Sequence, residues 1–214
     1  MSASITVTPL AETAILPGDI IISDESVAVS HSAICVGGNS IRDAAGNVLP
    51  DNAIAHAISG APVLGKLEDF GKDKATVYRA NPDLSLVDTA MLYRVSQAMA
   101  PKVQYGTNYA SLVFGSASFG AGAKTWLDDM RNRYINGEFT TKDDQGKMAN
   151  LVCSQFVVLI VQLALGEAHK SFIKLDARYT LPKTLRTYLT TVGSNWRVVG
   201  PFRTRFLTLG DTKM

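Results

Sequence analysis

The longest apolar stretch of the chain covers residues 150–166 and reads NLVCSQFVVLIVQLALG. Only a serine and two glutamines interrupt the apolar residues after Cys153, so a helix here would be apolar on every side and therefore buried. Asn150 can cap its first turn, and Gly166 can end its last. A membrane span needs about 20 apolar residues, more than this stretch offers. We therefore expect a core helix that carries Cys153 in its first turn.

The first part of the chain has the pattern of short strands bounded by turn residues. Apolar runs of this kind predict strands within residues 16–23, 27–38 and 74–80, and a strand pair over residues 39–59 that turns near residues 45–47 and includes AIAHAI. Side chains alternate along a strand, so His31, Ala33 and Cys35 should share one face of the second strand. By the same rule His56 should share a face with Ile54. Successive short strands of this kind favour a small, mostly antiparallel sheet or barrel.

After residue 80 the apolar residues recur at the spacing of helices. Asn81 and Pro82 have the order of a cap and a first helical residue, and Pro101 should end that helix. Further helices are expected near residues 124–135 and 182–189, and a closing strand near 195–202. The Gly- and Ala-rich residues 111–124 are interpreted as a loop or lid. The predicted class is α+β, with residues 1–214 forming one domain.

Composition narrows the classes of function. The 214 residues are 46% hydrophobic and 19% charged, which is ordinary for a globular protein, and the formal charge of +2 gives no case for a nucleic-acid partner. Two cysteines do not make a disulfide framework, which suits a reducing compartment. The first residues lack a basic and apolar leader, so we expect a cytoplasmic protein, or one that is exported without a signal peptide.

Cys153 is the candidate nucleophile, because unpaired N–H groups and the helix dipole favour a thiolate at a helix start. A cysteine nucleophile needs a base, and the base needs an orienting partner. His31 and His56 lie on strands that can be neighbours, whereas His169 lies just past the helix in a polar segment. Each has an ordinary alternative: free cysteines mostly fill space, and a histidine on an apolar face is commonly a hydrogen-bonded core residue. Cys35 is either close to this site or a small buried thiol.

Several short motifs resemble the NlpC-type papain-like cysteine peptidases. LPGDIII followed by SHSAICVGG is similar to the PGD and SH strand motifs of that family, and VCSQFVVLI is similar to its CS helix motif. The histidines precede QYG at Tyr105 and then Cys153, which is the order of the circularly permuted branch that includes relatives of the lecithin:retinol acyltransferase type. His56 departs from the glutamate that many permuted members carry.

The resemblance implies a papain-like fold with a small antiparallel sheet or barrel packed against helices. It also implies Cys153 as nucleophile, His31 as general base, His56 as the third polar residue and Tyr105 as an oxyanion or substrate-binding group. The implied activity is hydrolysis of amide bonds in peptidoglycan stem peptides, without a cofactor. Because no export signal is evident, an antibacterial effector with an immunity or secretion partner protein is one hypothesis, and a resident cytoplasmic enzyme is another.

Two other functions use the same residues. An acyltransferase or thioesterase would act on lipids or thioesters through the same Cys–His site, although no exposed basic amphipathic helix and no stable membrane insertion are expected. A metal module would hold zinc with Cys153, His31 and His56, but the sequence lacks the paired local spacings of structural zinc sites. We therefore expect no metal.

Overall fold

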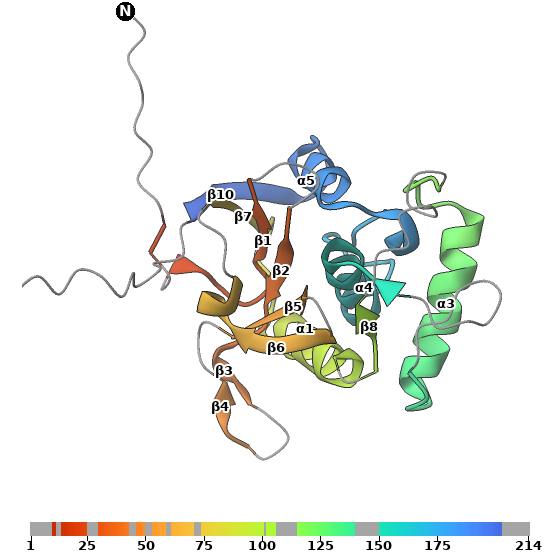
Figure 1. Ribbon diagram of the computed structural model, residues 1–214, viewed down its shortest axis with the longest axis horizontal. Coiled ribbons are helices and arrows are strands. Elements are labelled where there is room, and N and C mark those ends of the chain that lie inside the picture. The colour runs from red at the N-terminus through yellow and green to blue at the C-terminus, as the bar shows by residue number, and fades with distance from the viewer. Residues whose placement is uncertain are drawn as a thin grey trace, which may run out of the picture.

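A computed structural model describes residues 10–11, 14–24, 30–42, 46–49, 53–58, 61–70, 74–100, 102–105, 115–139 and 150–202. These residues form a six-stranded antiparallel sheet and four α-helices. Figure 1 shows the helices grouped on one side of the sheet, with α3 farthest from it. The predicted α+β class is confirmed.

The large sheet has the strand order β10-β7-β1-β2-β5-β6, with every neighbouring pair antiparallel. Its strands are β1 (Ile20–Ser23), β2 (Ser32–Cys35), β5 (Ala53–Ile58), β6 (Ala61–Lys66), β7 (Ala75–Ala80) and β10 (Trp196–Phe202). Apart from β6, each lies where the apolar pattern predicts a strand. Where one strand pair was predicted over residues 39–59, the structure has the hairpin of β3 (Gly38–Arg42) with β4 (Val48–Leu49), followed by β5. Residues 25–29, which include the start of the second predicted strand, lie outside the described part.

The two faces of the sheet contribute to two separate apolar clusters. Ile34 and Ala55 face the helices, whereas Ala33, Cys35 and Ile54 face the opposite side. That opposite side is covered by the 3-10 helix η2 (Leu67–Phe70) and by residues near Ile15. The alternation predicted for these strands is therefore present in the structure.

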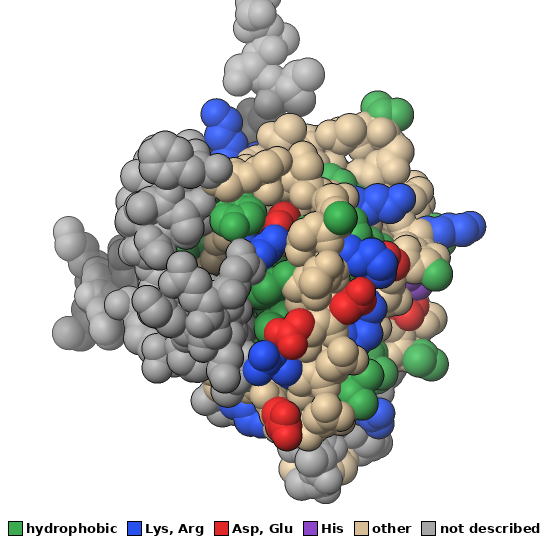
Figure 2. All heavy atoms as spheres, turned by 90° about the vertical axis from the view of Figure 1, so that its right-hand side faces the viewer, with side chains coloured by type: hydrophobic (Ala, Val, Ile, Leu, Met, Phe, Trp, Pro, Cys, Tyr) green, Lys and Arg blue, Asp and Glu red, His purple; other side chains and the backbone are tan. Residues whose placement is uncertain are grey.

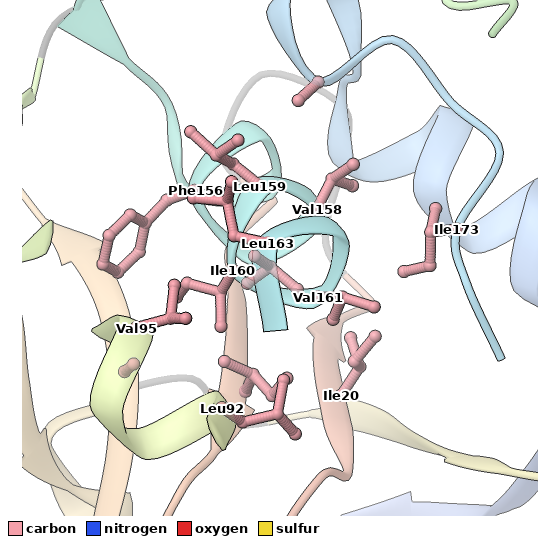
Figure 3. Packing of buried hydrophobic residues seen from close by; sticks show 14 of the residues in the cluster. Ile20, Leu92, Val95, Phe156, Val158, Leu159, Ile160, Val161, Leu163 and Ile173 are labelled. Carbon is pink, nitrogen blue, oxygen red and sulfur yellow. The ribbon is translucent and has the colours of Figure 1, made fainter. Parts of the chain in front are cut away.

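Helix α4 (Cys153–Leu165) fills the space between the sheet and the other helices, and every residue from Cys153 to Leu163 is buried. Figure 3 shows its side chains radiating in all directions, with Ile160 toward Val95 and Leu92 of α1 and Val161 toward Ile20 of β1. The helix starts at Cys153 rather than at an Asn150 cap, because Asn150 pairs with Gln104 in the short parallel pair β8 (Gln104–Tyr105) and β9 (Asn150–Leu151). Gly166 ends it, as predicted.

The other helices differ from prediction mainly where they begin. Helix α1 (Leu86–Met99) starts after a Ser85 cap, not at Pro82, because Ser85 and Asp88 form a capping box in which each side chain bonds the other's backbone N–H. Helix α3 (Ala121–Ile135) begins inside the stretch interpreted as a loop. Helix α5 (Pro182–Thr190) starts with proline at its first position, as expected.

Asp19 of the PGD motif forms a buried ion pair. Its side chain is fully buried, and both carboxylate oxygens accept hydrogen bonds of 2.7 Å from the guanidinium of Arg79 on β7. It also accepts the backbone N–H of Leu16 at 2.8 Å, and Arg79 donates to the carbonyl of Ala14 at 2.7 Å. The pair ties the turn before β1 to the centre of the sheet, so this motif residue serves the fold.

The surface over α3 carries charges of both signs. Lys124 lies 2.6 Å from Glu167 and 3.5 Å from Asp128, and Arg133 pairs with Asp129 at 2.8 Å. Figure 2 shows acidic and basic side chains interspersed on this face rather than gathered by sign. Among the described residues, no helix has the length and apolar character that crossing a membrane requires.

Candidate functional site

The two histidines predicted as base and partner lie in direct contact. His56 on β5 pairs with Ala33 on β2, which brings it beside the start of β2, where His31 precedes the first strand residue. Nε2 of His31 is 3.1 Å from Nδ1 of His56, and both side chains are buried. One of these nitrogens must carry a hydrogen and the other a lone pair, since two like groups cannot bond.

The backbone of His31 is fixed by β1. Its N–H donates to the hydroxyl of Ser23 at 2.7 Å, and its carbonyl accepts the N–H of Ser23 at 2.9 Å. Its ring packs on Phe70 of η2, with ring centroids 5.1 Å apart. These contacts fix the position of the histidine before any substrate is bound.

Cys153 approaches the same segment from the side of the sheet that α4 covers. Its sulfur is 3.9 Å from the carbonyl oxygen of Ser30, and it faces the backbone N–H and hydroxyl of Ser32. The His31 ring contacts the His56 ring and packs on Phe70, on the side of η2. Ser30 and Ser32, the chain neighbours of His31, therefore contact the thiol, and the residue between them carries one of the two rings.

The helix-start N–H groups favour the thiolate of Cys153, as predicted, but burial has the larger effect on its pKa. Burial raises the pKa of this thiol, and hydrogen bonds from Ser32 and from the backbone at the helix start only partly oppose that effect. The side chain is 4% exposed, so loss of hydration outweighs the helix-start N–H groups. The sulfur is therefore a neutral thiol at rest, and it needs a base to become a nucleophile.

His56 is neutral at physiological pH for the same physical reason. Burial lowers the pKa of its imidazole, and the negative charge of Asp69 opposes this. The structure thus combines a neutral thiol with a neutral His56 imidazole. Chemically, such a site can pass a proton from sulfur to nitrogen during attack, but it does not hold a preformed thiolate–imidazolium pair at these two residues.

The buried His56 predicts a loss of stability in acid. Its folded pKa lies below the unfolded value of 6.5, so below that pH the unfolded chain binds a proton that the native protein resists. The free energy of unfolding should fall as the pH drops from about 7.5 to about 5, and His56→Gln should show a shallower fall. Urea unfolding at both pH values measures this. An equal pH dependence in the two proteins would contradict the assignment.

The backbone of Tyr105 is paired with the segment just before Cys153. It pairs with Leu151 in the parallel pair of β8 and β9, two residues before Cys153. The position of its side chain is outside the described part of the structure. The backbone register nevertheless accounts for a link between the QYG motif and the thiol that the sequence separation does not suggest.

Sequence reasoning missed two groups of residues at the site. The first is the pair of serines at the sulfur, Ser30 and Ser32, and the second is Asp69, whose charge acts on His56. The serines carried a weak signal, as the residues on either side of His31. Asp69 carried none, because neither β6 nor the 3-10 helix η2 that follows it and contains Asp69 was predicted. Cys35 is fully buried in the cluster with Ile54 and Phe70, which favours the packing interpretation.

The remaining candidates do not join this site. His169 lies past α4 with its Nε2 3.6 Å from a carboxylate oxygen of Asp88. Within the residues that the structure describes, no three His, Cys, Asp or Glu side chains are grouped as a metal site would require.

Comparison of the chain with models of known protein families, with curated proteins and with solved structures gave no match.

Proposed function

We propose that this protein is a cysteine hydrolase that cleaves amide bonds. The observation that carries the proposal is the 3.1 Å contact between His31 and His56 at the start of β2, where residues 30–32 also contact the sulfur of Cys153. A histidine oriented by a second polar residue beside a helix-start cysteine is the arrangement that thiol hydrolysis uses. We also infer that the fold is a circularly permuted papain-like one, which the strand and helix order and the antiparallel sheet support.

The hydrogen bond between the two histidines determines which nitrogen of His31 can act as the base. With Nε2 of His31 bonded to His56, the ring nitrogen that accepts the proton of Cys153 is Nδ1. As Nδ1 takes this proton, the sulfur attacks the carbonyl carbon and forms a tetrahedral oxyanion, which the Cys153 backbone N–H and Tyr105 would stabilise. The C–N bond then breaks, His31 returns the proton to the leaving amine, and a thioester remains. Water, deprotonated by His31, hydrolyses the thioester and restores the thiol.

In this mechanism, substrate binding must bring the Cys153 sulfur and the His31 ring together. At rest the sulfur contacts Ser30 and Ser32, whereas the His31 ring packs on Phe70 of η2, so Nδ1 of His31 must come within hydrogen-bond reach of the sulfur in the reactive complex. Catalytic hydrogen bonds of unliganded enzymes are commonly long and shorten when substrate binds. Burial of Cys153 and His31 means that the substrate must also displace part of the present cover.

The proposed substrate is the stem peptide of peptidoglycan, on the strength of the motif resemblance. One further proposal is that the protein is an antibacterial effector that acts in the periplasm of competing bacteria and is neutralised in the producing cell by an immunity protein. Forced expression in the periplasm of a susceptible bacterium should then cause lysis or a growth defect. Normal growth at comparable protein levels would rule out the effector role while leaving the hydrolase untouched.

Purified sacculi and phospholipid vesicles test the substrate class directly. We expect the protein to release soluble peptide-containing fragments from sacculi, detected by mass spectrometry, and to release no fatty acid from vesicles. Fatty-acid release without cleavage of sacculi would overturn the amidase proposal in favour of the acyltransferase or thioesterase function. Inertness toward both substrates, with the protein folded, would count against hydrolysis of either kind.

A further inference from the structure

The outer ring nitrogen of His56 has no described hydrogen-bond partner. Nδ1 of this residue contacts His31, whereas Nε2 is buried and has no bond to any nitrogen or oxygen in the described residues. A buried ring nitrogen without a bond is costly, and it invites an explanation in terms of the charges around it. The charged group that acts on this ring is the carboxylate of Asp69.

Asp69 and His56 meet over Gly65. A Cβ atom added to this glycine of β6 would stand 2.7 Å from Oδ2 of Asp69 and 3.4 Å from Nε2 of His56. The two atoms therefore border the same small space, which is open only because the residue between them has no side chain. Oδ2 is held there by the backbone N–H of Lys66, which donates to it at 2.7 Å.

The charge of Asp69 acts on the tautomer of His56. A carboxylate near Nε2 favours the form that carries its hydrogen on that nitrogen. Nδ1 then has a lone pair and accepts from Nε2–H of His31, which leaves Nδ1 of His31 as the basic nitrogen. The opposite tautomer of His56 would donate to His31 at Nε2, so His31 would carry its hydrogen on Nδ1. That form cannot accept a proton from Cys153.

We propose that Asp69 is a positioning residue that, across the space left by Gly65, holds His56 in its Nε2–H tautomer and so keeps His31 ready to act as a base. The inference rests on the proposed function for its catalytic meaning, but the tautomer itself does not. Asp69 is exposed on its outer side, so solvent screens its charge and the effect is smaller than that of a buried triad carboxylate.

The experiment is ¹⁵N NMR of the three histidines at about pH 8, where neutral imidazoles show distinct shifts for N–H and bare nitrogens. His56→Gln assigns the His56 signals. We expect wild-type His56 to carry its hydrogen mainly on Nε2 and Asp69→Asn to move it toward Nδ1, while the bond to Lys66 is kept. Asp69→Glu should restore much of the wild-type pattern. Gly65→Ala should resemble Asp69→Asn, because its methyl group displaces the carboxylate without removing its charge.

Glu68→Gln is the matched control, since this exposed neighbour in η2 loses the same charge and is expected to leave the His56 signals unchanged. On the substrate identified with sacculi or vesicles, Asp69→Asn should lower kcat about 3- to 10-fold with little change in KM. An unchanged His56 tautomer in Asp69→Asn would overturn the inference. A changed tautomer in a protein that cleaves nothing would support the inference and count against the hydrolase.

Discussion

Cys153→Ala should lower the release of peptide fragments from sacculi by at least about 1,000-fold. The alanine has no sulfur to attack the carbonyl carbon, so no thioester can form. The substitution removes one buried atom from the start of α4 and should leave the circular dichroism spectrum unchanged. Mass spectrometry of the wild-type protein with a slowly hydrolysed substrate should also find an acyl group on Cys153.

The chain contains its own control for this experiment. Cys35 is the only other cysteine, and it is equally reduced and buried, but it lies in the cluster on the η2 side of the sheet. Cys35→Ala should retain activity within about 3-fold and lose only the small stability that a lost sulfur atom contributes. Full activity in Cys153→Ala, or equal losses in both variants, would exclude Cys153 as the nucleophile.

Arg79→Met should destabilise the protein by about 3–5 kcal/mol, the largest effect on stability that we expect from one surface-reaching side chain. The substitution leaves Asp19 without the guanidinium that bonds both of its oxygens, while the carboxylate stays fully buried. Urea unfolding at neutral pH measures the loss. Arg197→Met is the control, because Arg197 and Asp83 form an equally short pair at the surface and should contribute less than about 1 kcal/mol.

Acid should relieve part of the defect in Arg79→Met. Burial raises the pKa of Asp19 and the hydrogen bonds from Arg79 lower it, so the pKa should rise further when Arg79 is absent. The native variant then binds a proton that the unfolded chain does not, and its stability decreases as the pH rises through this range. The deficit relative to the wild type should therefore be smaller near pH 5 than near pH 8, by about 1 kcal/mol or more. A pH-independent deficit would refute the buried-charge explanation.

The elements that the sequence predicted best are those with a strong local pattern. The apolar run after Cys153, interrupted only by Ser154, Gln155 and Gln162, leaves burial as the only stable outcome for α4. Alternation in SAIC and AIAHAI predicted which residues share a face, and hence that His31 and His56 could meet. Because β2 and β5 pair as neighbouring antiparallel strands, the two rings come into contact.

The elements that were missed depend on distant partners. β6 contains Pro62 and Gly65, which weaken a local strand signal, and it forms because β5 pairs along its whole length. Asn150 was predicted to cap α4 but belongs to β9. At the actual start of α4, the side chain of Gln155 accepts the N–H of the N-cap residue Val152 at 2.9 Å. Asp69 follows β6, so its role at His56 could not be predicted before that strand was known.

The charge state of Cys153 was also beyond prediction from local sequence. A helix start favours a thiolate when the sulfur is hydrated, and the chain around Cys153 carries that favourable signal. Whether hydration is lost depends on how closely residues 30–32 pack against the sulfur, and these residues are more than a hundred positions away. The sequence therefore predicted a nucleophile at Cys153 but not the neutral state that burial of the thiol favours.

The position of α4 in the chain has a consequence for biosynthesis. The large sheet has six strands, but its outer strand β10 and the helix α4 that covers its apolar face are both translated after residue 150. A nascent chain that has reached only β7 exposes a row of isoleucine and alanine side chains that nothing yet shields. Such intermediates aggregate readily, so ribosome-associated chaperones should bind this protein during the second half of its translation.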